Sequence, residues 1–210
     1  NDGLLDIYVC RLWHSLDTED QAKRKNVLYI NKGDFKFVES AEAFGLADSG
    51  HGTQASFFDY DGDSDLDMFL LNAPSNNYSQ KLEYINNNAI PYEHSDKLFR
   101  NDGGKFTDVT KSAGLEDYGF GLGVTTVDLN LDGWTDIYVA NDFEIADHMW
   151  INQKNGTFKD EIQSKLKHIS FSSMGTDAAD ANNDGFVDIA VLDMQSNDHY
   201  RSKTNMPGMD

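Results

Sequence analysis

A chain of 210 residues with 36 acidic and 17 basic side chains has a formal charge of −19, which excludes nonspecific binding to nucleic acid because phosphate contacts need a positive surface. Its one cysteine, Cys10, excludes a disulfide within the chain, and no segment approaches the roughly 20 consecutive apolar residues of a membrane span. The length allows one or two ordinary domains.

Acidic loops recur along the chain, and the first copy is incomplete. Residues 1–6 supply positions 4 to 9 of the motif, with Asp2 at position 5 and Asp6 at position 9, so we expect the chain to begin within a repeat and to be a fragment. Three complete nine-residue copies follow, each with oxygen-bearing side chains at positions 1, 3, 5 and 9: residues 59–67, 128–136 and 180–188. Asp, Asn and Gly also form ordinary turns by themselves. Three complete copies with the same flanking pattern nevertheless favour a shared binding function over ordinary turns.

A bound cation explains this spacing, because carboxylates at every second residue of a tight loop would otherwise repel one another. Six to eight hard oxygen ligands suit calcium, whereas magnesium requires a stricter octahedron and retains its waters. A helix-flanked calcium loop would need Glu at position 12, where this chain has Leu70, Val139 and Val191. The sequence therefore predicts about three calcium sites in loops between strands. In loops of this kind the backbone carbonyl at position 7 also faces inward, which adds Asp65, Trp134 and Phe186.

The segments around the loops predict β-strands. Short apolar runs follow the complete loops at 66–71, 137–140 and 189–192. A second marker, an apolar segment ending in Asn, precedes a turn with glycine and then a Phe, which indicates a hairpin; the marker residues are Asn31, Asn101 and Asn152. Each unit then has strand A before the acidic loop, B after it, C at the marker Asn and D at the Phe. This pattern predicts an all-β fold: a β-propeller fragment of four-stranded antiparallel blades with calcium-binding A–B loops.

The predicted blades vary in length only between strands B and C. They divide the chain into a partial blade at 1–46, whole blades at 47–115 and 116–170, and a partial blade at 171–210. From a marker Asn to the next loop the distance is 28, 27 and 28 residues, whereas from a loop to the next marker Asn it is 25, 34 and 16 residues. The variable B–C connections lie on the face opposite the calcium loops, because neighbouring strands alternate in direction. We expect a glycan or protein ligand on that face, or else merely solvated insertions, at 14–26, 73–97 and 142–148.

Further motifs resemble a known repeat family. Gly119-Phe-Gly-Leu-Gly123 and Ser172-Ser-Met-Gly175 lead into strand A, and Asp136-Ile-Tyr-Val-Ala-Asn141 ends a loop and forms strand B. With the acidic loops, they are similar to the FG-GAP/VCBS family of calcium-binding β-propeller repeats, found in integrin alpha chains and bacterial surface proteins. The sequence of Asn101–Leu115 resembles the bacterial branch of this family, whose members are often joined to an ASPIC/UnbV domain.

This resemblance implies a location and a set of ligands. It implies export or a cell-surface position, and we expect the protein to be secreted, at the cell surface or periplasmic. It implies calcium ligation by the side chains at positions 1, 3, 5 and 9 of each complete loop: Asp59, Asp61, Asp63, Asp67, Asp128, Asn130, Asp132, Asp136, Asp180, Asn182, Asp184 and Asp188.

The sequence contains no catalytic constellation. The histidines form no His-x-x-x-His pair, and neither a Gly-x-Ser-x-Gly elbow nor a phosphate-binding Gly-Lys-Ser/Thr loop is present. We therefore expect a noncatalytic extracellular calcium-binding propeller that serves adhesion, glycan binding or protein assembly. Two alternatives stay open. One is the propeller portion of a secreted carbohydrate-active enzyme of the polysaccharide lyase type, with its active site outside this segment; the other is an integrin-like receptor head that needs a partner chain.

Overall fold

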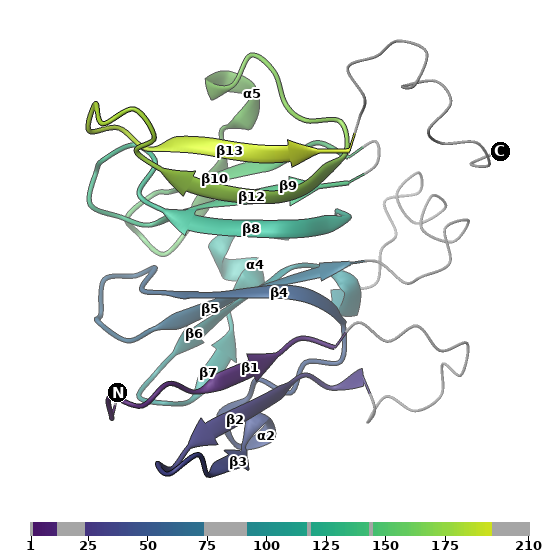
Figure 1. The fold of residues 1–210 in the computed structure, drawn as a ribbon, viewed down its shortest axis with the longest axis vertical. Helices are drawn as coiled ribbons and strands as arrows, with labels where there is room; N and C mark the ends of the chain where they lie inside the picture. The colour runs from purple at the N-terminus through teal and green to yellow at the C-terminus, as the bar shows by residue number, and fades with distance from the viewer. Residues whose placement is uncertain (1, 12–23, 74–91, 117–118, 143–144, 195–210) are drawn as a thin grey trace, which may run out of the picture.

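The strands form a row of four antiparallel sheets (Figure 1). The computed structural model describes residues 2–11, 24–73, 92–116, 119–142 and 145–194. Blade 1 contains β1 (Ile7–Val9), β2 (Val27–Asn31) and β3 (Phe37–Glu39), and blade 2 contains β4 (His51–Phe58), β5 (Asp67–Ala73), β6 (Lys97–Asn101) and β7 (Phe106–Asp108). Blade 3 contains β8 (Gly121–Val127), β9 (Asp136–Asn141), β10 (His148–Asn152) and β11 (Phe158–Asp160), and blade 4 contains β12 (Ser173–Ala179) and β13 (Asp188–Asp193). Sequential antiparallel pairing throughout confirms the predicted all-β, propeller-like arrangement.

The B strand of an inner blade is buried on both faces, because the blade packs between two neighbours. Met68 and Leu70 of β5 share a core cluster with blade 1, whereas Phe69 and Leu71 share one with blade 3. Strand β9 alternates in the same way between blades 2 and 4. Successive side chains of a strand point to opposite faces. A continuous apolar run after each acidic loop is therefore what this packing requires.

The A strands β4, β8 and β12 lie side by side and join the blades. The Gln54 side chain imitates a backbone group: its Nε2 donates to the Val124 carbonyl at 3.1 Å, and the Val124 N–H donates to its Oε1 at 3.0 Å. The hydroxyls of Ser56 and Thr126 hydrogen-bond at 2.7 Å. Side-chain hydrogen bonds thus connect β4 to β8 where no ladder joins the two sheets.

Three short helices follow the D strands, and the sequence pattern did not predict them. They are α2 (Ala41–Phe44), α4 (Thr110–Ala113) and α5 (Ile162–Lys165), and a 3₁₀ turn, η1 (Tyr92–His94), precedes β6. An acid at the end of each D strand accepts a hydrogen bond from the first helical N–H, over 2.8 Å at Glu39, 3.1 Å at Asp108 and 3.0 Å at Asp160. About one helical turn is too short to show a 3.6-residue period. No helix among the described residues is long enough to cross a bilayer.

Glycines in β8 allow a close approach to both neighbouring blades. A β-carbon on Gly121 would lie 2.4 Å from Leu71 Cδ1 in blade 2. One on Gly123 would lie 3.0 Å from the Gly175 Cα and the Thr176 nitrogen in blade 4. This crowding accounts for the glycines at positions 121 and 123.

We expect Gly123→Ala to reduce the free energy of unfolding by about 1–3 kcal/mol, because the added methyl group meets backbone atoms that cannot move aside. Gly175→Ala is the matched control: it occupies the same register position in β12, and its β-carbon would meet nothing within 4 Å. Urea denaturation followed by circular dichroism measures both changes. Equal unfolding midpoints for the two variants would contradict the packing argument.

Candidate metal centre in the A–B loops

The complete acidic loops connect A strands to B strands, as predicted. Residues 59–67 lead from β4 into β5, residues 128–136 from β8 into β9, and residues 180–188 from β12 into β13. The three loops lie along one edge of the row of blades, at the left in Figure 1. The B–C connections start from the opposite edge, because B and C are antiparallel.

The three loops share one backbone shape. Residues at positions 4 and 6 have left-handed φ angles, which favour glycine. At position 4, φ is 79° at Gly62, 58° at Leu131 and 62° at Asn183; at position 6 it is 73° at Ser64, 87° at Gly133 and 88° at Gly185. Each loop therefore holds one non-glycine residue in a left-handed conformation that the surrounding hydrogen bonds must maintain.

The carboxylate at position 1 closes each loop. Asp128 accepts the N–H groups of Asp132 at 3.0 Å and Gly133 at 2.7 Å. Asp180 repeats these bonds with Asp184 and Gly185, at 3.0 and 2.9 Å. Asp59 accepts from Gly62 at 2.8 Å and Ser64 at 3.0 Å. Two amide donors thus turn this side chain into the loop in all three copies.

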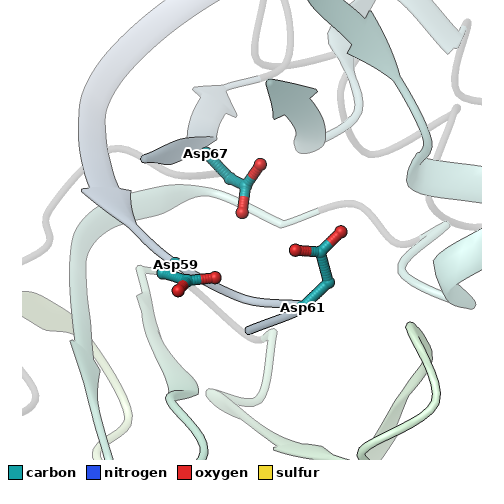
Figure 2. A group of neighbouring side chains, drawn as sticks. All are labelled: Asp59, Asp61 and Asp67. Carbon is teal, nitrogen blue, oxygen red and sulfur yellow. The ribbon is translucent and has the colours of Figure 1, made fainter. Parts of the chain in front are cut away.

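The carboxylates of Asp59, Asp61 and Asp67 converge in loop 59–67 (Figure 2). One oxygen of each lies within 4.8 Å of the others. Oxygens at about 2.3–2.6 Å from one calcium-sized cation would be separated by such distances. Over the described ranges, this is the one group of three His, Cys, Asp or Glu side chains that meets so closely. The donor set fits a hard divalent cation.

The two other loops bring together a mixed pair of oxygens. In loop 128–136 the Oδ1 atoms of Asp128 and Asn130 accept the same N–H, from Asp132, each at 3.0 Å. Loop 180–188 repeats this arrangement with Asp180, Asn182 and Asp184. Asn at position 3 leaves each of these loops with one carboxylate fewer than loop 59–67 has at positions 1, 3, 5 and 9.

The remaining predicted ligands hydrogen-bond to backbone amides. At position 5, Asp63, Asp132 and Asp184 each accept the N–H of position 7, at 2.8, 3.0 and 2.9 Å. These position-7 residues are Asp65, Trp134 and Phe186, and the Asp65 side chain also accepts the Gly103 N–H at 3.1 Å. A carboxylate oxygen that accepts one hydrogen bond keeps a lone pair for a metal ion.

The carboxylate at position 9 has a second role that the motif did not predict. Asp67 is fully buried and accepts the N–H groups of Tyr60 at 3.0 Å and Asn101 at 2.8 Å. Asp136, equally buried, accepts from Leu129 at 3.0 Å and from Asn152 at 2.8 Å. Asp67 and Asp136 therefore each join their own loop to strand C of the same blade.

The marker Asn completes this contact, which we call the Asp–Asn clamp. Asn101 Nδ2 donates to the Leu66 carbonyl at 3.0 Å, and its Oδ1 accepts the Gly104 N–H at 2.7 Å. Asn31 makes the corresponding bonds in blade 1, with the Leu5 carbonyl at 3.1 Å and the Gly33 N–H at 2.9 Å. Sequence spacing found these asparagines but not their hydrogen bonds to the acidic loop.

Burial and neighbouring charge make the ionised form costly at three of these carboxylates when no cation is bound. Burial raises the pKa of Asp67 to about 6, to which the charges of Asp61 and Asp63 contribute. The pKa of Asp61 is raised first by burial and then by the charge of Asp63. Burial likewise raises the pKa of Asp136. A divalent cation would offset the repulsion that these carboxylates experience.

The predicted ligand face is described only in part. Within the B–C segments, residues 14–23, 74–91 and 143–144 lie outside the described residues. The described ends of these segments are well anchored: Asn26, Asp96 and Asp147 are buried. The expected glycan or protein ligand of this face stays a prediction.

We expect Asp67→Asn to destabilise the protein in EDTA by about 1–3 kcal/mol, because a carboxamide has one acceptor oxygen and would leave the N–H of Tyr60 or Asn101 unpaired. Asp102→Asn, in the half-exposed β6–β7 turn, is the control. Chemical denaturation in EDTA separates this effect from any lost metal. Unchanged stability of Asp67→Asn would argue against the clamp.

Comparison with known proteins assigns the repeat. A model of the family described as FG-GAP-like repeat matches residues 1–70, 84–139 and 128–191. A search of curated proteins found no match. The matched segments cover most of the chain and span the strand–loop–strand units described above. This chain therefore belongs to the FG-GAP-like repeat family.

Proposed function

We propose that this chain is part of a noncatalytic calcium-binding β-propeller that works outside the cell. The observation that carries the proposal is the convergence of Asp59, Asp61 and Asp67 around a space that one cation can fill. Loops 128–136 and 180–188 repeat the same left-handed backbone positions and supply two further candidate sites. The proposal therefore assigns one calcium ion to each complete loop.

The donor chemistry favours calcium over magnesium. All of the proposed side-chain donors are carboxylate or carboxamide oxygens, which hard cations prefer. Several of them are already fixed by backbone amides, as the bonds of Asp59 to Gly62 and Ser64 show. Calcium accepts such irregular sets of six to eight oxygens, whereas magnesium demands an octahedron and keeps its waters. The position-7 carbonyls of Asp65, Trp134 and Phe186, and water, would complete the shells.

Calcium would act on stability rather than on chemistry. A cation in loop 59–67 would join the end of β4 to the start of β5, and Asp67 would extend this connection to β6 through Asn101. A ligand that binds only the folded state at 100 times its Kd adds about 2.7 kcal/mol of stability. Three such sites would replace the disulfides that one cysteine cannot form.

The proposal places the protein outside the cell, with its ligand on the B–C face. Extracellular calcium modules bind with Kd values of roughly 10⁻⁴ to 10⁻³ M, which require the calcium levels of a secreted, cell-surface or periplasmic setting. We assign the glycan or protein ligand to the B–C face because loops on the other face are committed to the cation. The sequence pattern of Asn101–Leu115 supports the proposal that the chain belongs to the bacterial branch joined to ASPIC/UnbV domains.

Calorimetric titration tests the metal assignment. We expect about one calcium per complete acidic loop and a fall in Tm of several degrees when EDTA removes it, because the bound ion adds to the free energy of unfolding. Asp61→Ala should abolish one binding event while the other loops still bind. Absence of calcium binding to the wild-type protein would refute the proposed function.

Calcium binding should also depend on pH between about 5 and 7.5. The folded pKa of Asp67, about 6, lies above its unfolded value of about 3.9, so its contribution to metal-free stability is present at low pH and is lost as pH rises through 6. Calcium must displace the proton below pH 6, which weakens its binding. We expect the calcium-induced gain in Tm to be larger at pH 7.5 than at pH 5. An equal gain at both pH values would contradict this linkage.

A further inference from the structure

Blade 3 reaches into loop 59–67 of blade 2. Asn152, at the end of β10, donates from Nδ2 to the Tyr60 carbonyl at 2.8 Å. The indole of Trp134 covers Gly62, where a β-carbon would lie 3.3 Å from Trp134 Cη2. Tyr60 and Gly62 are the residues on either side of Asp61. Blade 3 therefore holds the backbone before and after one of the three converging carboxylates.

The ring, the N–H and the carbonyl of Tyr60 each have a partner. Its side chain is buried, and its ring stacks on Phe158 of β11 with centroids 6.1 Å apart and an interplanar angle of 29°. Its N–H donates to Asp67 at 3.0 Å, while its carbonyl accepts from Asn152. Two of these three contacts of Tyr60, which lies between Asp59 and Asp61, therefore come from blade 3.

Hydrogen bonds connect position 9 of one loop to position 9 of the next. Asp136 accepts the Asn152 N–H at 2.8 Å, the Asn152 side chain donates to Tyr60, and the Tyr60 N–H donates to Asp67. Asn152 Nδ2 also approaches the Thr135 carbonyl of its own loop at 3.3 Å. Three hydrogen bonds therefore separate the buried carboxylates of two candidate metal sites.

This cross-blade bond distinguishes Asn152 from the equivalent marker residues. Asn31 and Asn101 occupy the same position in blades 1 and 2, yet their Nδ2 atoms donate to carbonyls of their own blades, at Leu5 and Leu66. Trp134 differs too: it is half-buried against Gly62, whereas Phe186 at the same loop position is 65% exposed. The contact of Trp134 gives its side chain a role beyond the expected ligation by its carbonyl.

We infer that Asn152 and Trp134 are positioning residues for the cation site of Asp59, Asp61 and Asp67, and that this site is linked to loop 128–136. The inference rests on the proposed calcium function. Donors that are already in place lower the ordering cost of binding calcium, and the contacts from blade 3 restrain the residues that flank Asp61. Linkage is reciprocal, so an ion in either loop changes the affinity of the other loop by the same factor.

Calorimetry on site variants tests this inference. The binding event that disappears in Asp61→Ala identifies loop 59–67. We expect Trp134→Ala to weaken that event by about 5-fold or more, within the usual range of coupling between sites. Asn152→Asp should weaken it as well, since it keeps the N–H for Asp136 and an acceptor for the Lys154 N–H but removes the donor to Tyr60. Loop 180–188 accepts none of the hydrogen bonds described for Trp134 and Asn152, and it should keep its affinity.

Matched variants separate positioning from a general loss of stability. Phe171→Ala removes a partly exposed aromatic side chain elsewhere, and Asn31→Asp repeats the amide exchange at the equivalent position of blade 1; both should leave loop 59–67 within twofold of wild type. If the wild-type protein binds no calcium, the proposed function itself fails. If it binds calcium but Trp134→Ala and Asn152→Asp leave loop 59–67 unchanged, or if all sites weaken equally, the inference is overturned and the proposed function stands. Should Trp134→Ala not fold, Asn152→Asp alone decides.

Discussion

The hydrogen bonds between a position-9 aspartate and the marker asparagine organise every blade whose C strand is described. They join the acidic loop to strand C, at Asp6–Asn31, Asp67–Asn101 and Asp136–Asn152, each over 2.8 Å. Strand C is separated from its loop in sequence by a connection of variable length, so the local chain cannot set their distance. In blades 2 and 3 the buried carboxylates of Asp67 and Asp136 set it by accepting two amide N–H groups each, because leaving either donor unpaired would cost about 1–3 kcal/mol.

At the other end of each B–C strand pair, a side-chain oxygen again accepts a backbone N–H. The Asn72 N–H donates to Asp96 at 2.8 Å, the Asn141 N–H to Asp147 at 2.8 Å, and the Arg11 N–H to Asn26 at 2.8 Å. These acceptors stand just before strand C, where the variable connection ends. With both ends of the strand pair fixed, insertions of different length can leave from this edge without changing the register. That explains why the variation of 16 to 34 residues is confined to the B–C half of the repeat.

Periodic features of the fold were predictable from sequence, and contacts between blades were not. The strands, their order and the position of the acidic loops follow from the alternation of apolar runs with Asp-rich turns, which repeats often enough to exclude chance. The one-turn helices were not predicted, because four residues are too few for a 3.6-residue period to repeat. The contact of the Trp134 side chain was not predicted for a different reason: its partner Gly62 is 72 positions away in the sequence and carries no side chain. Of the site, the convergence of Asp59, Asp61 and Asp67 follows from the motif, whereas their dependence on Asn152 requires the packing of two blades.

Strand β10 connects the two faces of the molecule because both of its ends contact a neighbouring blade. Asn152 at its last position bonds to Tyr60 of blade 2 on the loop face. Asp147, just before its first position, is buried and accepts hydrogen bonds from the Ser173 hydroxyl of blade 4 at 2.8 Å and from the Tyr138 hydroxyl at 2.7 Å. A five-residue strand that is held at both ends has little room to shift at one end alone. An ion that orders the loop face would therefore also restrain the start of β10, where the B–C connection of blade 3 ends, and the two faces need not act independently.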